Sequence, residues 1–283
     1  MAEKSPFTVD SDWLAERLKT PGLSIVDASW YLPVQRRDAK ADYDAAHIPG
    51  AIFFDQDLVV DPASSLPHTL PKPALFARFA GSMGISADDT IVVYDGPGLF
   101  SAPRVWWMFR IMGVAEVFIL DGGFDRWKAE GRPVTAQPTR IAPCVFHAEF
   151  DAERVVSFAE MRDIVASGSA QVADARPAGR FAASDPEPRP GLRGGHMPGA
   201  KNVPALSLSR NGELLPLDEL GSVLEAAGLD LSKPVVTSCG SGVTAATISF
   251  ALYSLGKGDH RLYDGSWTEW GGHPDTPVVT GKD

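Results

Sequence analysis

The sequence predicts an α/β fold built from two tandem domains of one kind, each with a central, mostly parallel sheet flanked by helices. Three observations support this prediction. Short runs of Val, Ile and Leu alternate with helical segments, a pattern typical of parallel sheets covered on both faces. With 283 residues the chain has room for two domains of ordinary size. Its second half also repeats landmarks of its first half, which indicates a duplicated unit.

In the first half, the strands follow from short β-rich runs and the helices from apolar residues at three- and four-residue spacing. In chain order we predict a helix at 11–19, a strand at 25–26, a helix at 74–83, a strand at 91–93, a helix at 103–112 and a strand at 117–120. We bound this domain at residues 1–138. A polar stretch with two prolines then predicts a linker, which we place at 139–152.

The second half shows the same alternation, and we bound its domain at residues 153–283. In chain order we predict a helix at 157–166, a strand at 172–173, a helix at 217–227, a strand at 235–237, a helix at 245–255 and a strand at 261–263. A stiff, proline-rich loop at 185–191 interrupts this half.

The repeat is clearest in two pairs of landmarks. A His-[Ile/Met]-Pro-Gly-Ala motif begins at His47 and again at His196, and a tryptophan closes each copy at Trp127 and Trp270. The motif occurs in both copies, although only one copy carries a candidate nucleophile. We therefore interpret both histidines as parts of structural turns rather than as catalytic groups.

Composition argues against several classes of function. The net charge of −10 disfavours nucleic acid as a partner. The chain has no long apolar run and its start lacks the apolar segment of a signal peptide, so we expect no membrane association and a cytoplasmic location. There the two cysteines, Cys144 and Cys239, should be reduced thiols. The six histidines are scattered and no Cys/His cluster has ligand spacing, so we expect no metal site. We also expect no cofactor.

The loop 239–244, Cys-Gly-Ser-Gly-Val-Thr, lies between a predicted strand and a predicted helix. Backbone N–H groups of such a loop and the positive end of the helix form a cradle for an anion. A cysteine in that cradle has its thiolate favoured, and the thiolate is the nucleophile. We therefore predict that Cys239 is a catalytic nucleophile rather than a small buried apolar residue. Cys144 lies in the predicted linker and is interpreted as an incidental thiol.

The corresponding loop of the first copy, 95–100, reads Asp-Gly-Pro-Gly-Leu-Phe. Asp95 cannot act as a sulfur nucleophile, and its carboxylate would repel anions. We predict that this loop is catalytically silent and that the first copy forms a wall of the active site, since ligand sites often lie between domains.

A cysteine phosphatase is a second enzyme class to weigh, because such enzymes use a C-x5-R catalytic loop. Counted from Cys239, the arginine should stand at position 245, where this chain has Ala245. The loop is thus one residue and one cation short for phosphate.

The paired domains, both histidine motifs, the segment 102–108 (Ala-Pro-Arg-Val-Trp-Trp-Met) and the cysteine loop together resemble the two-domain rhodanese-type sulfurtransferases. The resemblance covers nearly the whole chain. Within the family, the neutral loop is similar to that of the subgroup that uses 3-mercaptopyruvate, whereas members specific for thiosulfate carry a basic Cys-Arg-Lys-Gly-Val-Thr loop. Thiosulfate as the preferred donor is the main alternative, and a non-catalytic sulfur-carrier module is a remote one.

The resemblance implies rhodanese-like domains and sulfur transfer through a persulfide on Cys239 to cyanide or to a thiol such as thioredoxin or glutathione. It also implies that Arg180 and Arg189 bind the substrate carboxylate, for which planar guanidinium groups are suited. Arg193 is a weaker candidate from the same region. The N–H groups of the loop would steady the persulfide, which assigns substrate contacts to Gly240, Gly242, Val243 and Thr244.

A proton relay is the last implication of the resemblance, with Ser241 in the loop and His68 and Asp57 in the first domain. Its use would be to protonate the enolate of pyruvate as it leaves. Ordinary alternatives stay open: Ser241 as a loop residue, His68 as a structural histidine and Asp57 as a turn former. Thr244 could instead cap the following helix.

We expect a monomer, because the site is self-contained.

Overall fold

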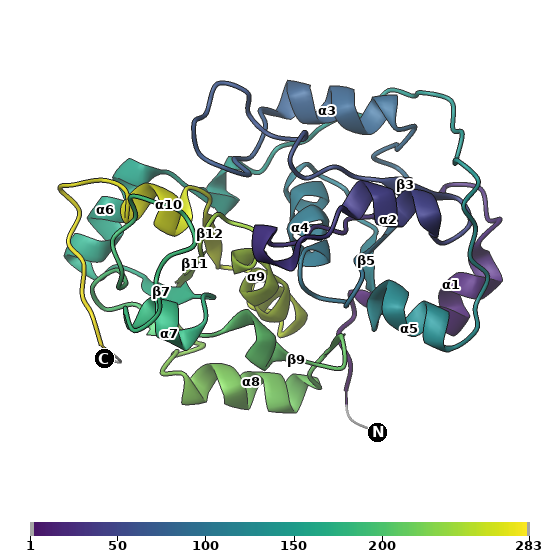
Figure 1. Cartoon of the computed structure of the whole chain (residues 1–283). Coiled ribbons are helices and arrows are strands. Elements are labelled where there is room, and N and C mark those ends of the chain that lie inside the picture. The colour runs from purple at the N-terminus through teal and green to yellow at the C-terminus, as the bar shows by residue number, and fades with distance from the viewer. Residues whose placement is uncertain (1–2, 282–283) are drawn as a thin grey trace.

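The computed structural model describes residues 3–281, and its core is a pair of five-stranded parallel sheets (Figure 1). The strands of the first sheet are Thr8–Val9 (β1), Leu23–Asp27 (β2), Ala51–Phe53 (β3), Thr90–Tyr94 (β4) and Val117–Leu120 (β5), in the order β1-β5-β4-β2-β3. The strands of the second are Val155–Val156 (β6), Gln171–Asp174 (β7), Lys201–Asn202 (β8), Val235–Ser238 (β11) and Arg261–Tyr263 (β12), in the order β6-β12-β11-β7-β8. The matching strand orders confirm the predicted repeat.

Helices flank both sheets (Figure 1). In the first half they are Ser11–Arg17 (α1), Ala39–Ala45 (α2), Pro73–Ser82 (α3), Ala102–Ile111 (α4) and Gly123–Ala129 (α5). In the second half they are Phe158–Ser167 (α6), Ala178–Phe181 (α7), Leu217–Ala226 (α8), Ala245–Ser254 (α9) and Ser266–Trp270 (α10). Short 3-10 helices lie at Pro33–Gln35 (η1), Ala152–Arg154 (η2) and Ala205–Leu208 (η3), and a hairpin joins Ser209–Arg210 (β9) to Glu213–Leu214 (β10).

Local sequence signals explain several of these boundaries. The Ser157 side chain accepts the N–H of Glu160 and the Glu160 side chain accepts the N–H of Ser157, a capping box that starts α6. Gly168 ends the same helix with φ of 66°. Asp10 caps α1 in a similar way by accepting the N–H of Trp13.

Helices α4 and α9 pack against each other in the centre of the molecule (Figure 1). Each helix directly follows one of the twin loops, and nearly all of its residues are buried. The Trp106 ring of α4 meets Phe250 and Tyr253 of α9 edge to face, at centroid distances of 4.8 and 5.3 Å. The main hydrophobic core therefore contains residues of both halves, which brings the two loops to one junction.

All the strands and helices predicted from the sequence are present. Those missed are short: the outer strands β1, β3, β6 and β8, the β9–β10 hairpin, and helices α2 and α7. Segments of two to seven residues are too short to show a clear periodic pattern. Most of the predicted linker 139–152 has neither helix nor strand, although Phe146 within it packs on Phe76 and Phe109. The limits 1–138, 139–152 and 153–283 stay a prediction.

Candidate active site

Cys239 stands directly after β11, a strand whose four residues are all buried. Its own side chain is 1 % exposed, and the N–H of Gly242 donates to its Sγ at 3.2 Å. Gly242 has φ of 83°, and a Cβ there would lie 3.0 Å from the Asp264 carbonyl oxygen. Only glycine fits this position without strain. The glycine lets the loop turn so that a backbone N–H faces the sulfur, as expected of a cradle.

The carbonyl groups of the loop point away from the sulfur. The Cys239 carbonyl accepts the N–H of Trp267, and the Gly240 carbonyl accepts the N–H and the hydroxyl of Thr268. Both partners belong to α10, so that helix keeps negative oxygens away from Sγ. Thr244 precedes α9, but its side chain makes no capping hydrogen bond and lines the neighbouring cavity.

The loop of the first half is filled by its own carboxylate. Asp95 is fully buried, and its Oδ2 accepts the N–H groups of Phe100, Ser101 and Ala102 at 2.6–2.9 Å. Burial raises the pKa of Asp95, while these hydrogen bonds oppose the rise. The cradle thus holds an internal anion where the second half holds a thiol, which gives a physical reason for its predicted silence.

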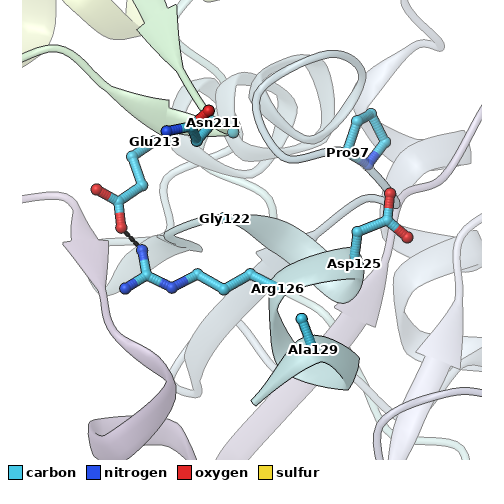
Figure 2. Close-up of a pocket in the computed structure, with 8 residues that line it drawn as sticks. Pro97, Gly122, Asp125, Arg126, Ala129, Asn211 and Glu213 are labelled. Carbon is cyan, nitrogen blue, oxygen red and sulfur yellow. Dashed lines mark ion pairs between the residues drawn. The ribbon is translucent and has the colours of Figure 1, made fainter.

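The β9–β10 hairpin closes the same loop from outside. The Gly212 carbonyl accepts the N–H of Gly122, and a Cβ on Gly98 would lie 2.4 Å from that carbonyl oxygen. Figure 2 shows the open pocket beside this contact, crossed by the ion pair of Arg126 and Glu213. The pocket has a volume of about 700 Å³ but no cysteine, histidine or serine in its lining, so we do not assign chemistry to it.

A cavity of about 220 Å³ lies beside Cys239. The first half contributes Trp30, Leu32 and Phe100 to its lining. The second half contributes the loop residues Cys239, Gly240, Ser241, Val243 and Thr244 and also Ala175, Arg176, Pro177, Arg180, Pro188, Arg189, Pro204, Ala205 and Leu206. The cavity therefore lies between the halves, in line with the predicted wall.

Arg180 and Arg189 both line this cavity but differ in their partners. Arg180 donates to Glu187 Oε2 through Nη2 at 2.5 Å and through Nε at 3.2 Å, and its Nη2 would lie 3.2 Å from a Cβ on Gly240. Burial and the charge of Arg180 lower the pKa of Arg189. Within residues 3–281 the Arg189 guanidinium makes no hydrogen bond or ion pair, which leaves it available for a carboxylate.

Two charged residues that sequence reasoning missed support Arg180. The Glu187 side chain is 1 % exposed and also accepts from Arg176 at 2.8 Å. Arg176, equally buried, donates to both carboxylate oxygens of Asp174 and stacks over Trp267. A comparison of the two copies could have revealed Arg176, because the first copy has the uncharged Ser29 at the matching position after its strand.

Arg193, the weaker candidate, is not part of the cavity. Its guanidinium donates to the backbone carbonyls of Trp270, Gly271, His273 and Thr276. These hydrogen bonds use the side chain to hold the chain after α10, so the expectation of a substrate contact was wrong for this residue.

The residues of the predicted relay lie in contact across the junction. His68 Nδ1 lies 2.9 Å from Ser241 Oγ, and His68 Nε2 lies 3.0 Å from Asp57 Oδ1. The hydrogen bond from His68 is the main cause that lowers the pKa of Asp57, so this carboxylate is ionised near neutral pH. An ionised Asp57 fixes the proton of neutral His68 on Nε2, and Nδ1 then accepts the Ser241 hydroxyl.

Trp30 is a neighbour of the relay that the sequence did not reveal. Its Nε1 donates to both Asp57 oxygens at 3.2 Å, and its ring meets His68 edge to face at 4.8 Å. Trp30 therefore supports two relay residues while forming part of the cavity wall.

The two motif histidines lie elsewhere and are buried. His47 Nδ1 donates to the Tyr43 carbonyl and His196 Nδ1 to the Phe181 carbonyl, and each imidazole stacks on the ring of that partner. Each histidine backbone also pairs with a segment near the end of its copy, at Thr135 and at Val279. These contacts favour the structural interpretation.

Two features are absent from the described part of the chain. Between residues 3 and 281, no group of three or more His, Cys, Asp or Glu side chains is arranged to hold a metal ion. Over the same range, no helix has the length and apolar character needed to span a membrane. Both cysteines are free thiols, Cys239 buried and Cys144 exposed.

Comparison with known proteins gives consistent matches. The family model described as the rhodanese-like domain matches residues 10–130 and again residues 157–273. An Escherichia coli protein named 3-mercaptopyruvate sulfurtransferase is 44 % identical over 271 residues, which cover 95 % of this chain and 96 % of the relative. A Cricetulus griseus protein named thiosulfate sulfurtransferase is 42 % identical over 284 residues, which cover 97 % and 95 %. The crystal structure of SseA, a 3-mercaptopyruvate sulfotransferase from Escherichia coli, matches with a TM-score of 0.86 at 42 % identity, over 92 % of this chain and 98 % of that one.

Proposed function

The chain belongs to the two-domain rhodanese-type sulfurtransferases, and we propose that it moves the sulfur of 3-mercaptopyruvate through a persulfide on Cys239 to a thiol or to cyanide, releasing pyruvate. The observation that carries the choice of donor is the hydrogen bond between Ser241 Oγ and His68 Nδ1. Ser241 lies in the loop, two residues after Cys239. An enolate leaving group needs a proton, and this pair can supply one.

In the first half-reaction, Arg189 and Arg180 hold the carboxylate of the donor in the cavity. The Cys239 thiolate attacks the donor sulfur, and the C–S bond breaks with its electron pair on the carbon, giving the enolate of pyruvate. The donor thiol gives up its proton through Ser241 to His68 Nδ1, and Asp57 stabilises the positive charge that His68 then carries. The same relay returns this proton through Ser241 to the enolate. The proton that the donor thiol loses balances the one that pyruvate gains.

The persulfide then waits in the cradle for an acceptor. The N–H of Gly242 already points at Sγ, and the loop carbonyls are bonded to α10, so the loop favours negative charge on sulfur. A thiol such as thioredoxin or glutathione, or cyanide, attacks the outer sulfur and releases the Cys239 thiolate. The cycle is therefore ping-pong. We also propose a monomer that works in the cytoplasm.

Thiosulfate is the second candidate donor, favoured by the relative named thiosulfate sulfurtransferase. Its outer sulfur would move to Cys239 and sulfite would leave with the bonding electrons, a step that needs no proton. Against this candidate, the loop offers Gly240 and Ser241, which are neutral, to a dianion. We expect thiosulfate turnover as a side activity.

The test is side-by-side steady-state kinetics of both donors with cyanide and with thioredoxin as acceptors, joined to mass spectrometry of the chain after each donor alone. The proposal predicts a higher kcat/KM for 3-mercaptopyruvate and one added sulfur on Cys239. A clear preference for thiosulfate would reverse the donor. An unmodified Cys239, or turnover that survives Cys239→Ser, would refute the persulfide, and inactivity with both donors would favour a sulfur-carrier module.

A further inference from the structure

Arg104 is a buried cation that the mechanism above does not use. It lies in α4 within the segment 102–108, is 2 % exposed, and packs its guanidinium over the Trp107 ring. Its Nη2 donates to the His68 carbonyl oxygen and to Asp264 Oδ1, both at 2.7 Å. Asp264 comes from the turn between β12 and α10, so this ion pair joins the two halves of the chain.

The pair holds the backbone on both sides of the relay histidine. Arg104 binds the carbonyl of His68, and Asp264 Oδ2 accepts the N–H of Leu70 at 2.7 Å. His68 has φ of 57°, a left-handed conformation that a non-glycine residue keeps only where its surroundings hold it. The two hydrogen bonds are such a restraint.

The same pair touches the loop that carries Ser241. A Cβ on Gly242 would lie 3.2 Å from Arg104 Nη1 and 3.2 Å from Asp264 Oδ1. The ion pair is thus in contact with the residue next to Ser241 and bonded to the backbone of His68. It is therefore adjacent to the backbone of both His68 and Ser241, whose side chains form the 2.9 Å hydrogen bond that links the halves.

The fold itself does not require this charge. Helix α9, which matches α4 in the second half, is formed and buried without any charged side chain. A buried ion pair adds little net stability compared with apolar packing, because both ions lose their hydration. A positional use of the pair explains its presence better than stability does.

We propose that Arg104 and Asp264 are positioning residues of the Ser241–His68–Asp57 relay, which they set at hydrogen-bonding distance across the junction. This inference rests on the proposed function. Its consequence depends on the donor, because the enolate from 3-mercaptopyruvate needs a proton from the relay whereas sulfite from thiosulfate leaves without one. A loosened pair should therefore impair one donor and spare the other.

The test substitutes Arg104→Lys, which keeps the charge but loses the planar fork, and uses Arg110→Lys as the matched control. Arg110 lies on the same helix and donates to the carbonyls of Val114 and Ala115, away from the relay. For Arg104→Lys we expect kcat with 3-mercaptopyruvate to fall by about 10- to 100-fold, the scale of a misplaced general acid. The kcat with thiosulfate should change by less than about threefold, and Arg110→Lys should leave both donors within about twofold.

Combination with Ser241→Ala separates positioning from a general structural effect. If Arg104 acts through the relay, Arg104→Lys costs little more once Ser241 is absent, so the two losses are not additive. Equal losses with both donors, additive losses in the double variant, or no loss at all would overturn the inference. If Arg104→Lys does not fold, Asp264→Asn takes its place, since it keeps one acceptor oxygen for the two donors. Wild-type enzyme inactive with 3-mercaptopyruvate refutes the proposed function and this inference together, whereas intact wild-type turnover with additive losses overturns the inference alone.

Discussion

Asp27 allows a quantitative test of how the two halves differ in charge. It ends β2 and is 3 % exposed, and burial, the largest cause, raises its pKa from 3.8 to about 6. Its counterpart Asp174 has the Arg176 guanidinium on both carboxylate oxygens, whereas Asp27 receives the N–H of Ser29. Ionisation of Asp27 therefore costs stability that an arginine offsets in the second half.

The direction of the pH dependence follows from proton linkage. Between pH 3.8 and about 6 the folded chain binds more proton at Asp27 than the unfolded chain, so the free energy of unfolding falls as pH rises through this window. A pKa raised from 3.8 to about 6 corresponds to roughly 3 kcal/mol, all of it lost above the folded pKa.

Asp27→Asn removes this titration and keeps an oxygen for the Ser29 N–H. We expect the variant to be more stable than the wild type by up to about 3 kcal/mol near pH 8 and by much less near pH 4, measured by urea unfolding at both values. Asp174→Asn is the matched control and should lose about 2 kcal/mol near pH 8, because it weakens charge-assisted hydrogen bonds. A variant at Asp27 that is less stable near pH 8, or equally shifted at both values, would refute the reasoning.

Two further changes test the cavity and the loop. Glu187→Gln weakens the ion pair that orients Arg180. Steady-state kinetics should then show the KM for 3-mercaptopyruvate raised about 10-fold, with kcat within about threefold of the wild type. A lower kcat at unchanged KM would contradict the contact proposed between Arg180 and the substrate carboxylate. Gly242→Ala places a Cβ 3.0 Å from the Asp264 carbonyl oxygen at φ of 83°, so persulfide formation followed by mass spectrometry should slow by about 10-fold or more. Gly256→Ala is its control, with φ of 71° and open space, and equal effects at both glycines would show that crowding is not the cause.

The sequence allowed the nucleophile to be predicted because its signal is local. A strand, a glycine-containing loop and a helix are adjacent in the chain around Cys239, so the cradle follows from short-range patterns. The repeat then exposed Asp95 as its counterpart. The relay is different, since His68 and Ser241 are 173 positions apart and nothing in their spacing predicts contact. Only the family resemblance suggested that pairing.

The missed residues share a physical cause, which is that their partners come from irregular segments. Glu187 meets Arg176 and Arg180 because the proline-rich loop folds back over α7, and no periodic pattern reports such a fold. Trp30 reaches Asp57 from the loop after β2. The misjudged Arg193 belongs to the same group, since its acceptors are backbone carbonyls whose positions no side-chain pattern reveals.

The asymmetry of the duplicated fold gives a physical reason to propose one active site rather than two. In the first half, Asp95 supplies the anion that its cradle would otherwise bind, and the hairpin at Gly212 closes the opening. In the second half, Cys239 leaves the cradle ready for a charge that arrives with the substrate. In the proposed mechanism the first half provides the relay residues that the second half lacks, since His68 and Asp57 follow β3 in the first copy. Helices α4 and α9 bury their faces on each other, so Cys239 and the proposed relay residues rest on one shared core. The proposed chemistry would therefore depend on the contact between the halves rather than on either copy alone.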